Sequence, residues 1–477
     1  MENFIDTERV LEIFKEFSAI PHGSGNTSGV ADYCIGVAKK LSLEYVRDSI
    51  GNVIIYKPAC GCDKKEPVIM QGHLDMVCEK RADKNIDFIK EGITVCREGD
   101  FIFADGTTLG GDDGIAVAII LAILEDNTLT HPPIEAVFTV DEETGMDGAT
   151  ALDTSLLKGK TMLNLDSEDE DTLWVSCAGG ARVNIDLPVA RKANAATGTA
   201  FKITLSGLLG GHSGTEIDKH RINAVHALTV FLQNLINNTS ASLVSFAGGL
   251  MDNAIPREAS ATVTGVDEAV LCAFADEYAA QLKKAYPNET ALVLSAEPEK
   301  GCSRASLTNE SALAVLSLVS SCPDGVIKMS EKIKGLVQTS LNLGIMKLES
   351  ANFHISFSVR SSVNSEKSEL MLELEKAALA HGASYASSGA YPAWEYNEVS
   401  PLRDVISQEY EKLTGKKCEV KAIHAGLECG IFYDKIKGLD CVSMGPNILD
   451  IHTPDERLSV SSVERVCALL SRTLESL

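Results

Sequence analysis

The chain has 477 residues, of which 45% are hydrophobic and 23% are charged, which is typical of a globular protein with two or more domains. It carries 43 Lys and Arg against 67 Asp and Glu, so its net charge is −24. Nucleic acids and anionic membranes require a basic surface, and this charge argues against both as partners. The sequence has no run of about 20 apolar residues, so we expect no membrane span.

The 13 cysteines are scattered along the chain, and the tightest pair, Cys60 and Cys62, lacks the spacing of a zinc ribbon. This pattern favours reduced thiols in a cytoplasmic protein over a disulfide framework. Residues 1–21 are acidic and amphipathic and end at a proline. They predict a surface helix and not a signal peptide.

Helical and strand patterns alternate over residues 1–181 and again over 393–477. Helices are predicted at 27–41, 114–126, 401–415, 430–436 and 460–475, and apolar strands at 43–48, 52–57, 68–72, 134–140, 161–166, 418–423 and 440–445. Continuous apolar strands between helices indicate a sheet that is covered on both faces. We therefore predict an α/β domain with helices on both sides of a mixed sheet.

The middle of the chain, residues 182–392, has a different pattern. An order of helix, two strands, helix and strand appears twice, first over 219–296 and then over 311–392. The two stretches share no clear residue-level repeat, so they only hint at a doubled α+β unit. The simplest organisation is an α/β domain, residues 1–181 and 393–477, that is interrupted by an inserted α+β domain.

Acidic and imidazole side chains gather in five places, each at a predicted strand end or beside a glycine turn. These are His73 with Asp75, and residues 110–114, 141–145, 164–171 and 450–457. The carboxyl ends of strands are where α/β sheets bind ligands. Alone, each cluster also fits a helix cap or a solvated turn, and 168–171 is expected to be such a turn. Together they form a set of nitrogen and oxygen ligands suited to two zinc-like ions.

Eight motifs along the chain carry a family resemblance: "GHLDMV", "GGDDG", "DEETG", "LDSE", "GGHSG", "NAIPREA", "HAGLECG" and "HTPDER". In this order they resemble the aminoacyl-histidine dipeptidases (Xaa-His dipeptidases), within the clan of co-catalytic zinc aminopeptidases, carboxypeptidases and aminoacylases. The resemblance covers nearly the whole chain. It implies a zinc-peptidase catalytic domain whose insert serves as a lid.

The resemblance also implies a metal centre for two divalent ions. His73 and Asp166 would bind one ion, Glu143 and His452 would bind the other, and Asp112 would bridge them. Zinc is the expected metal, although cobalt and manganese share such ligands.

Further residues would carry the chemistry around this centre. Asp75 would orient His73, and the Asp112–Asp113 peptide bond would be cis. Adjacent residues on an extended chain point apart, so Glu142 can serve as general base while its neighbour binds metal. His212 would reach the scissile carbonyl. Relatives vary at the position of Asp113, so the resemblance gives it no other role.

Substrate-binding residues are implied in and near the insert. Asn253 and Arg360 resemble residues that hold the C-terminal end of the substrate. His424, Gly426 and Glu428 match a segment near the substrate site.

The predicted function is a two-metal dipeptidase that cleaves Xaa-His dipeptides, including β-alanyl-histidine, by attack of a water that bridges the metals. A tripeptidase, a carboxypeptidase or an acyl-amino-acid deacylase would share the same metal core. A non-catalytic metal-binding or peptide-binding protein would be expected to lose the base or a ligand, and here all are present. The resemblance leaves two oligomeric states open: a homodimer, or a chain whose doubled lid replaces a partner subunit.

Overall fold

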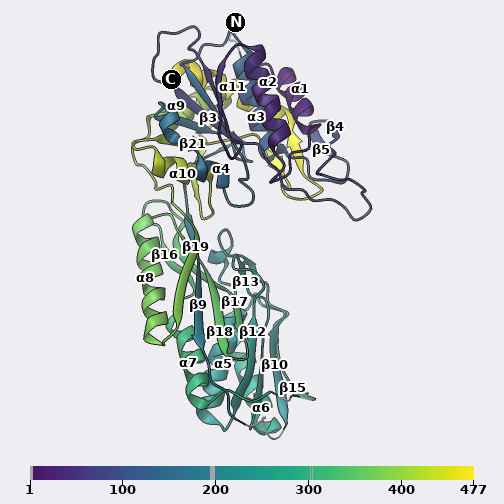
Figure 1. Ribbon diagram of the computed structural model, residues 1–477, viewed down its shortest axis with the longest axis vertical. Coiled ribbons are helices and arrows are strands. Elements are labelled where there is room, and N and C mark those ends of the chain that lie inside the picture. Colours follow the sequence, from purple (N-terminus) through teal and green to yellow (C-terminus); the bar gives the residue numbers. More distant parts are fainter. Residues whose placement is uncertain (1–3, 194–198, 301, 303) are drawn as a thin grey trace. The chain divides into compact units, whose positions relative to one another are not determined.

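The computed structural model describes residues 4–193, 199–300, 302 and 304–477 (Figure 1). The chain divides into two compact units, of which unit 1 comprises residues 1–177, 396–422 and 427–477, and unit 2 comprises 178–395 and 423–426. The predicted boundaries at 181/182 and 392/393 lie a few residues away. The return of 423–426 to unit 2 has no counterpart in the sequence patterns. Among the described residues, no helix is both long and apolar enough to cross a membrane.

Unit 1 is built on an eight-stranded mixed sheet. Its order is β1 (Glu44–Arg47), β2 (Val53–Lys57), β6 (Ile134–Thr139), β3 (Val68–His73), β7 (Thr161–Asn164), β21 (Asp440–Ser443), β8 (Thr172–Cys177) and β20 (Glu419–Ile423). The central strands β6, β3, β7 and β21 are parallel neighbours. Every residue of β3 and β6 is buried, as expected for strands covered on both faces.

Helices pack on this sheet as the α/β pattern predicts. They are α1 (Thr7–Ser18), α2 (Ser28–Lys40), α3 (Gly111–Glu125), α4 (Asp147–Ala151), α9 (Pro401–Thr414), α10 (Glu428–Lys435) and α11 (Val460–Ser476). Side chains of α1, α2, α3 and α11 share one hydrophobic core with the strands. A smaller sheet, β22 (Ile448–Leu449), β23 (Arg457–Ser459), β5 (Phe101–Ala104) and β4 (Val95–Glu98), holds the loop 450–456 between its first two strands.

Unit 2 contains the same order of elements twice. One repeat is β10 (Ala200–Ser206), α5 (Ala224–Asn238), β12 (Ser242–Gly248), β14 (Ala259–Thr264), α6 (Glu268–Ala285) and β15 (Val293–Glu299). The other is β9 (Gly179–Pro188), α7 (Asn309–Ser321), β17 (Val337–Leu348), β18 (Asn352–Ser361), α8 (Asn364–Ala380) and β19 (Ser384–Tyr391). Each is a β-α-β-β-α-β unit, and the first is inserted after the opening strand of the second.

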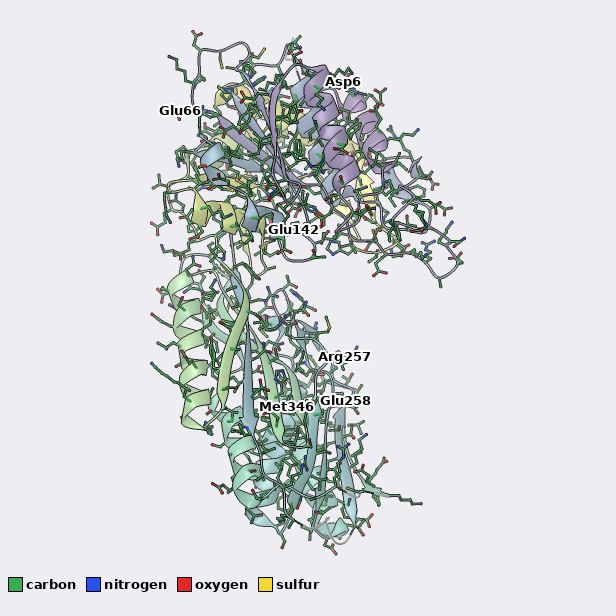
Figure 2. The ribbon with its side chains drawn as sticks, viewed as in Figure 1. Asp6, Glu66, Glu142, Arg257, Glu258 and Met346 are labelled. Carbon is green, nitrogen blue, oxygen red and sulfur yellow. The ribbon has the colours of Figure 1, made fainter. Side chains whose placement is uncertain are left out.

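The two repeats of unit 2 form one continuous sheet in the order β15-β10-β14-β12-β17-β18-β9-β19, with β16 (Gly325–Met329) paired to β17. They meet where β12 pairs with β17, at Ala247 with Lys347 and Gly248 with Met346. Figure 2 labels Met346 among these strands. The second repeat's order is the reverse of the first's, so the two halves are related as a doubled unit.

The alternation of side chains decides which face of this sheet can bind a ligand. Phe353, Ile355, Phe357 and Val359 of β18 belong to the core formed with the helices. Because neighbouring residues on a strand point to opposite faces, Arg360 lies on the other face, and so does Ser340, its partner on β17.

Candidate metal centre

The candidate centre lies in unit 1 at the carboxyl ends of three neighbouring parallel strands. His73 is the last residue of β3, Asp166 follows β7, and Glu142 and Glu143 follow β6. Figure 2 labels Glu142. Because β6, β3 and β7 are adjacent and parallel, their ends bring these side chains together. Asp112 joins them from the start of α3.

Asp112 lies between the two histidines. The Nε2 atom of His73 is 3.1 Å from Oδ1 of Asp112 and 3.6 Å from Oδ1 of Asp166. The Nε2 atom of His452 is 3.1 Å from the other oxygen of Asp112, Oδ2, and 3.0 Å from Oε1 of Glu143. Each histidine therefore faces its own oxygen of a single carboxylate. The peptide bond that follows Asp112 is cis, as predicted.

The electrostatics of the cluster fit divalent cations. Burial raises the pKa of Glu142, Glu143 and Asp166, and neighbouring carboxylates raise it further. Hydrogen bonds to Asp112 and Glu143 raise the pKa of His452 to about 10. Burial opposes the charged form of His73, yet the surrounding carboxylates raise its pKa well above the usual value. A group of acids this crowded is stabilised by positive charge, which metal ions would supply.

Two separate sets of ligand atoms lie close enough to hold ions: Asp112, Glu143 and His452 form the first, and His73, Asp113 and Asp166 form the second. A third set, His73 with Glu142 and Glu143, shares residues with both, and the atoms of each set lie within 4.8 Å of one another. The first set matches the predicted ligands. The second adds Asp113, whose Oδ2 accepts a hydrogen bond from the backbone N–H of His73 at 3.1 Å. Both sets are nitrogen and oxygen donors of the kind that zinc-like ions accept.

Asp75 supports two parts of the centre at once. The Nδ1 atom of His73 lies 3.0 Å from the backbone oxygen of Asp75 and 3.5 Å from its Oδ1. The same carboxylate accepts hydrogen bonds from the backbone N–H groups of Glu142 at 3.0 Å and Glu143 at 3.3 Å, and from Ser24 at 2.8 Å. Asp75 therefore holds the turn with the two glutamates as well as the His73 ring.

Glu456 supports the centre, a role that the sequence patterns do not assign to it. Its Oε2 accepts hydrogen bonds from the backbone N–H groups of Leu109 and Gly110, and its Oε1 from those of Gly111 and Asp112. These groups lie at the start of α3, where N–H groups otherwise lack partners. Glu456, only 3% exposed, thus holds the segment that carries the shared carboxylate. Glu456 directly precedes β23 and lies in the motif HTPDER, but nothing in the sequence links it to the backbone of residues 109–112.

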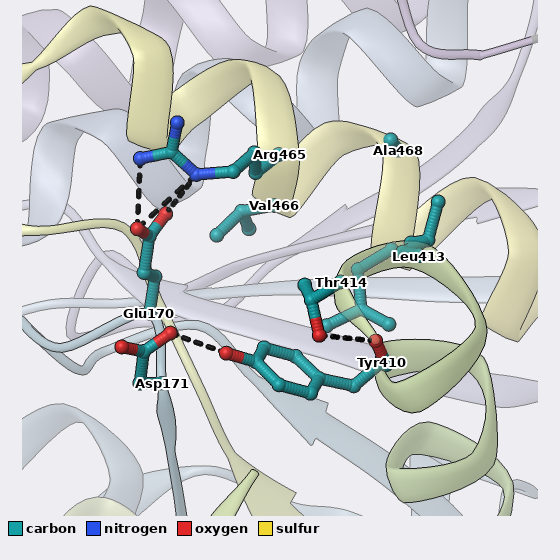
Figure 3. A pocket seen from close by; sticks show the side chains of 9 residues that line it. Glu170, Asp171, Tyr410, Leu413, Thr414, Arg465, Val466 and Ala468 are labelled. Carbon is teal, nitrogen blue, oxygen red and sulfur yellow. Dashed lines mark hydrogen bonds and ion pairs between the residues drawn. The ribbon is translucent and has the colours of Figure 1, made fainter. Parts of the chain in front are cut away.

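The acidic turn after Asp166 is less solvated than expected, because residues 168–170 are half-buried and only Asp171 is exposed. Burial and the nearby carboxylates of Asp112 and Asp166 raise the pKa of Glu168 to about 8. Glu170 forms an ion pair with Arg465 of α11, with an N–O distance of 2.8 Å, and Asp171 accepts a hydrogen bond from Tyr410 of α9 (Figure 3). Beside these bonds is a cavity of about 110 Å³. The turn is therefore anchored to two helices.

Hydrogen bonds within unit 2 determine which ring nitrogen of His212 carries the proton. Its Nδ1 accepts hydrogen bonds from the backbone N–H groups of Gly214 at 3.3 Å and Thr215 at 3.2 Å. The ring proton of the neutral form is therefore on Nε2. Burial and the charge of Arg360 lower the pKa of His212, which favours this neutral form. Asn253 is the neighbour of this segment, because its backbone oxygen accepts a hydrogen bond from Ser213.

Arg360, His424 and Gly426 gather on one face of unit 2. Arg360 is 9% exposed and its Nη1 donates to the Tyr391 hydroxyl at 3.2 Å. A Cβ atom on Gly426 would lie 2.8 Å from the Tyr391 ring, so only glycine allows the tyrosine to pack here. His424 is bonded to Ser340 at 2.7 Å, and burial and Arg360 lower its pKa to about 3. Among the described residues, the Nε of Arg360 is buried without a hydrogen-bond partner.

Glu428 stands apart from the other candidate substrate residues. It lies in unit 1 at the start of α10 and is completely buried. Its Oε2 accepts hydrogen bonds from Gln71 of β3 and Thr139 of β6, both at 2.6 Å.

Comparison with known proteins decides the family. Residues 69–476 match the model of peptidase family M20/M25/M40. The chain belongs to this family.

Two relatives align with this family member over almost their whole length. The cytosol non-specific dipeptidase of Escherichia coli is 36% identical over 476 residues, which is 99% of this chain and 98% of that protein. The crystal structure of aminoacylhistidine dipeptidase from Vibrio alginolyticus is 35% identical with a TM-score of 0.91, covering 98% of this chain and 96% of that one. An aminopeptidase of Bacillus cereus, at 16% identity, 99% coverage of both chains and a TM-score of 0.59, shares the fold. The family resemblance predicted from the motifs is confirmed.

Proposed function

We propose that this member of the family is a two-metal dipeptidase. The observation that carries the proposal is the position of Asp112, whose two carboxylate oxygens each face a different histidine at 3.1 Å. A shared carboxylate of this kind suits two cations roughly 3.5–4 Å apart. The relatives named as dipeptidases support the choice of substrate.

His73 and Asp166 would hold one ion and Glu143 and His452 the other, with Asp112 shared between them. When bound, zinc, cobalt or manganese ions would polarise the peptide carbonyl and lower the pKa of a bound water toward 7. We expect zinc because imidazole and carboxylate ligands suit it.

Glu142 is proposed as the general base. Its backbone is held by Asp75, as is that of the adjacent ligand Glu143. Its carboxylate takes a proton from the attacking water and then delivers it to the leaving amine. Without metal ions, burial and neighbouring acids raise the pKa of Glu142, which strengthens its carboxylate as a proton acceptor.

His212, Asn253, Arg360, His424 and Gly426 are proposed as the residues that recognise the substrate. The Nε2–H of His212 is suited to donate to the oxygen of the scissile carbonyl. Arg360 has a planar fork that binds both oxygens of a terminal carboxylate, and its Nε has no partner in unit 2. Anchoring the free carboxylate favours short peptides over proteins.

We propose Xaa-His dipeptides, including β-alanyl-histidine, as the preferred substrates, although one relative is named non-specific. A tripeptidase, a carboxypeptidase or an acyl-amino-acid deacylase would use the same metal residues. We also propose a cytoplasmic location, as in the relative named cytosolic, and either a homodimer or a monomer in which the doubled unit 2 replaces a partner.

The test is hydrolysis by metal-free protein to which zinc, cobalt or manganese is returned. The panel contains Xaa-His dipeptides, β-alanyl-histidine, dipeptides without histidine, a tripeptide, an N-acyl amino acid and a dipeptide amide. We expect metal-dependent release of amino acids from dipeptides, fastest with a C-terminal histidine and weakest with the amide. Faster cleavage of the tripeptide or the N-acyl amino acid would replace the dipeptidase with one of its rivals, and no hydrolysis would refute the proposal.

A further inference from the structure

Glu428 is a carboxylate without access to solvent, close enough to the candidate metal centre for the charges of His73, Asp166 and Asp75 to influence its pKa. It is 0% exposed, and its Oε1 has no hydrogen-bond partner. Burial raises its pKa to about 7. A buried carboxylate is costly, so its presence calls for a role. The family motif suggested contact with substrate, but a residue that is completely buried is poorly placed for one.

The hydrogen bonds of Glu428 cross the central strands of unit 1. Its Oε2 accepts from Nε2 of Gln71 on β3 and from the hydroxyl of Thr139 on β6, both at 2.6 Å. The Oε1 of Gln71 accepts from Nδ2 of Asn164 on β7 at 2.6 Å. One chain of buried polar side chains therefore joins β6, β3 and β7, which are neighbours in the sheet.

Each of the three strands joined by these hydrogen bonds leads into a residue of the metal centre. Gln71 lies two residues before His73, and Asn164 lies two residues before Asp166. Thr139 lies four residues before Glu143. The hydrogen bonds thus fix the spacing of the strand ends just before the ligands emerge from them. Groups that hold ligand-bearing segments in this way control metal affinity without touching the metal.

We propose that Glu428 is a positioning residue for the metal centre, acting through Gln71 and Thr139, and that it does not contact the substrate. The inference rests on the proposed metal centre. The essential element is an acceptor oxygen that receives two hydrogen bonds, one from each of two strands.

Three substitutions separate this role from its alternatives. Glu428→Gln keeps an oxygen that can accept from both Gln71 and Thr139, and places its amide where the unpartnered oxygen was. Glu428→Leu removes the acceptor. Thr139→Val removes one of the two donors with almost no change of shape. Glu135→Gln is the matched control, because Glu135 is a buried carboxylate at the other end of β6 that accepts from Lys158 and Gly159.

The readout is zinc affinity of the metal-free protein, measured by competition with a chelating dye in the absence of substrate, together with kcat and KM at saturating zinc. We expect Glu428→Leu to weaken zinc binding roughly 10-fold or more and Thr139→Val by a smaller factor, each with KM unchanged. The zinc affinity of Glu428→Gln should remain within about threefold of that of the parent protein, and the zinc affinity of Glu135→Gln should equal that of the parent.

Several outcomes would overturn the proposal. Unchanged zinc affinity with a raised KM in Glu428→Leu would make Glu428 a substrate-binding residue. Equal losses in the Gln and Leu variants would show that its charge, and not its hydrogen bonds, matters. If the Leu variant does not fold, the Thr139→Val variant is sufficient for the test, because an unchanged zinc affinity in that variant would refute the proposal. Since zinc binding is measured without substrate, a failure of the dipeptidase assay in the parent protein is a separate result.

Discussion

Replacing Glu456 with Gln tests how the shared carboxylate of the metal centre is held. The Glu456 carboxylate accepts four backbone hydrogen bonds, of which the shortest are 2.7 Å from Leu109 and 2.8 Å from Gly111. Gln has almost the same shape but only one acceptor atom. Its amide group would face two backbone N–H groups, which are donors like itself.

The expected cost follows from those two groups. Hydrogen bonds to a charged group contribute about 1.5–3 kcal/mol each, so losing the two bonds to one oxygen should destabilise unit 1 by roughly 3–6 kcal/mol. For a unit of this size, 1 kcal/mol lowers Tm by about 2–4 °C, which gives a fall of roughly 6–24 °C. Zinc affinity should fall as well, because Gly111 and Asp112 lose their anchor.

The assay is thermal unfolding of the metal-free protein, paired with zinc competition. Glu135→Gln is again the control, since it too removes acceptors from backbone N–H groups, those of Lys158 and Gly159. Both variants should be destabilised, but only Glu456→Gln should bind zinc more weakly. A loss below about 1 kcal/mol, with zinc affinity unchanged, would refute the anchoring role of Glu456.

The remaining predictions concern catalysis, substrate binding, acid stability and metal removal. Glu142→Ala should lower kcat at least 100-fold while zinc titration still shows two bound ions, and unchanged turnover would remove Glu142 from the mechanism. Arg360→Lys should raise KM about 10-fold for dipeptides but not for dipeptide amides, and equal losses on both would exclude carboxylate anchoring. Burial, Arg360 and His212 lower the pKa of His424 from 6.5 in the unfolded chain to about 3 in the folded protein. Below pH 6.5 only the unfolded state binds this proton, so the free energy of unfolding is highest above pH 6.5 and decreases as the pH falls toward 3. Urea unfolding at pH 5 and 7.5 should therefore show about 2 kcal/mol more acid destabilisation in the parent than in His424→Gln, and equal pH dependence would contradict this shift. A chelator should abolish dipeptide hydrolysis and lower Tm, and zinc should restore both; activity that survives chelation would argue against the metal mechanism.

The sequence predicts the fold, and the clustering of the candidate metal residues, because both have local signals. Apolar strands between helices mark the sheet of unit 1, and His73 and Asp166 stand at or just beyond the ends of such strands. Parallel strands carry their ends to one edge, so sequence position translates into proximity. The repeated order of elements in unit 2 was equally visible, although its residues show no repeat.

Glu428 and Glu456 lie in the motifs HAGLECG and HTPDER, but no local signal identifies the residues that they bond. Glu428 bonds to Gln71, 357 positions earlier in the chain, and Glu456 bonds to Leu109, 347 positions earlier. Glu168 belongs to an acidic run that resembles a solvated turn, and only the folded chain encloses it near Asp112. Contacts of this range depend on the complete topology, and no pattern within a single segment encodes them.

The nested arrangement of unit 2 makes one half of it a removable module. The inner repeat begins at β10 and ends at β15, and these strands pair so that Ala200 lies opposite Glu299. Its entry and exit points are therefore adjacent, and excision of 200–299 followed by a short linker would leave every element of the outer β-α-β-β-α-β unit connected. The excision would also uncover the part of β17 that pairs with β12. An uncovered strand edge invites pairing between chains, so a shortened protein would need further charged residues beside Met346 to prevent association through this edge.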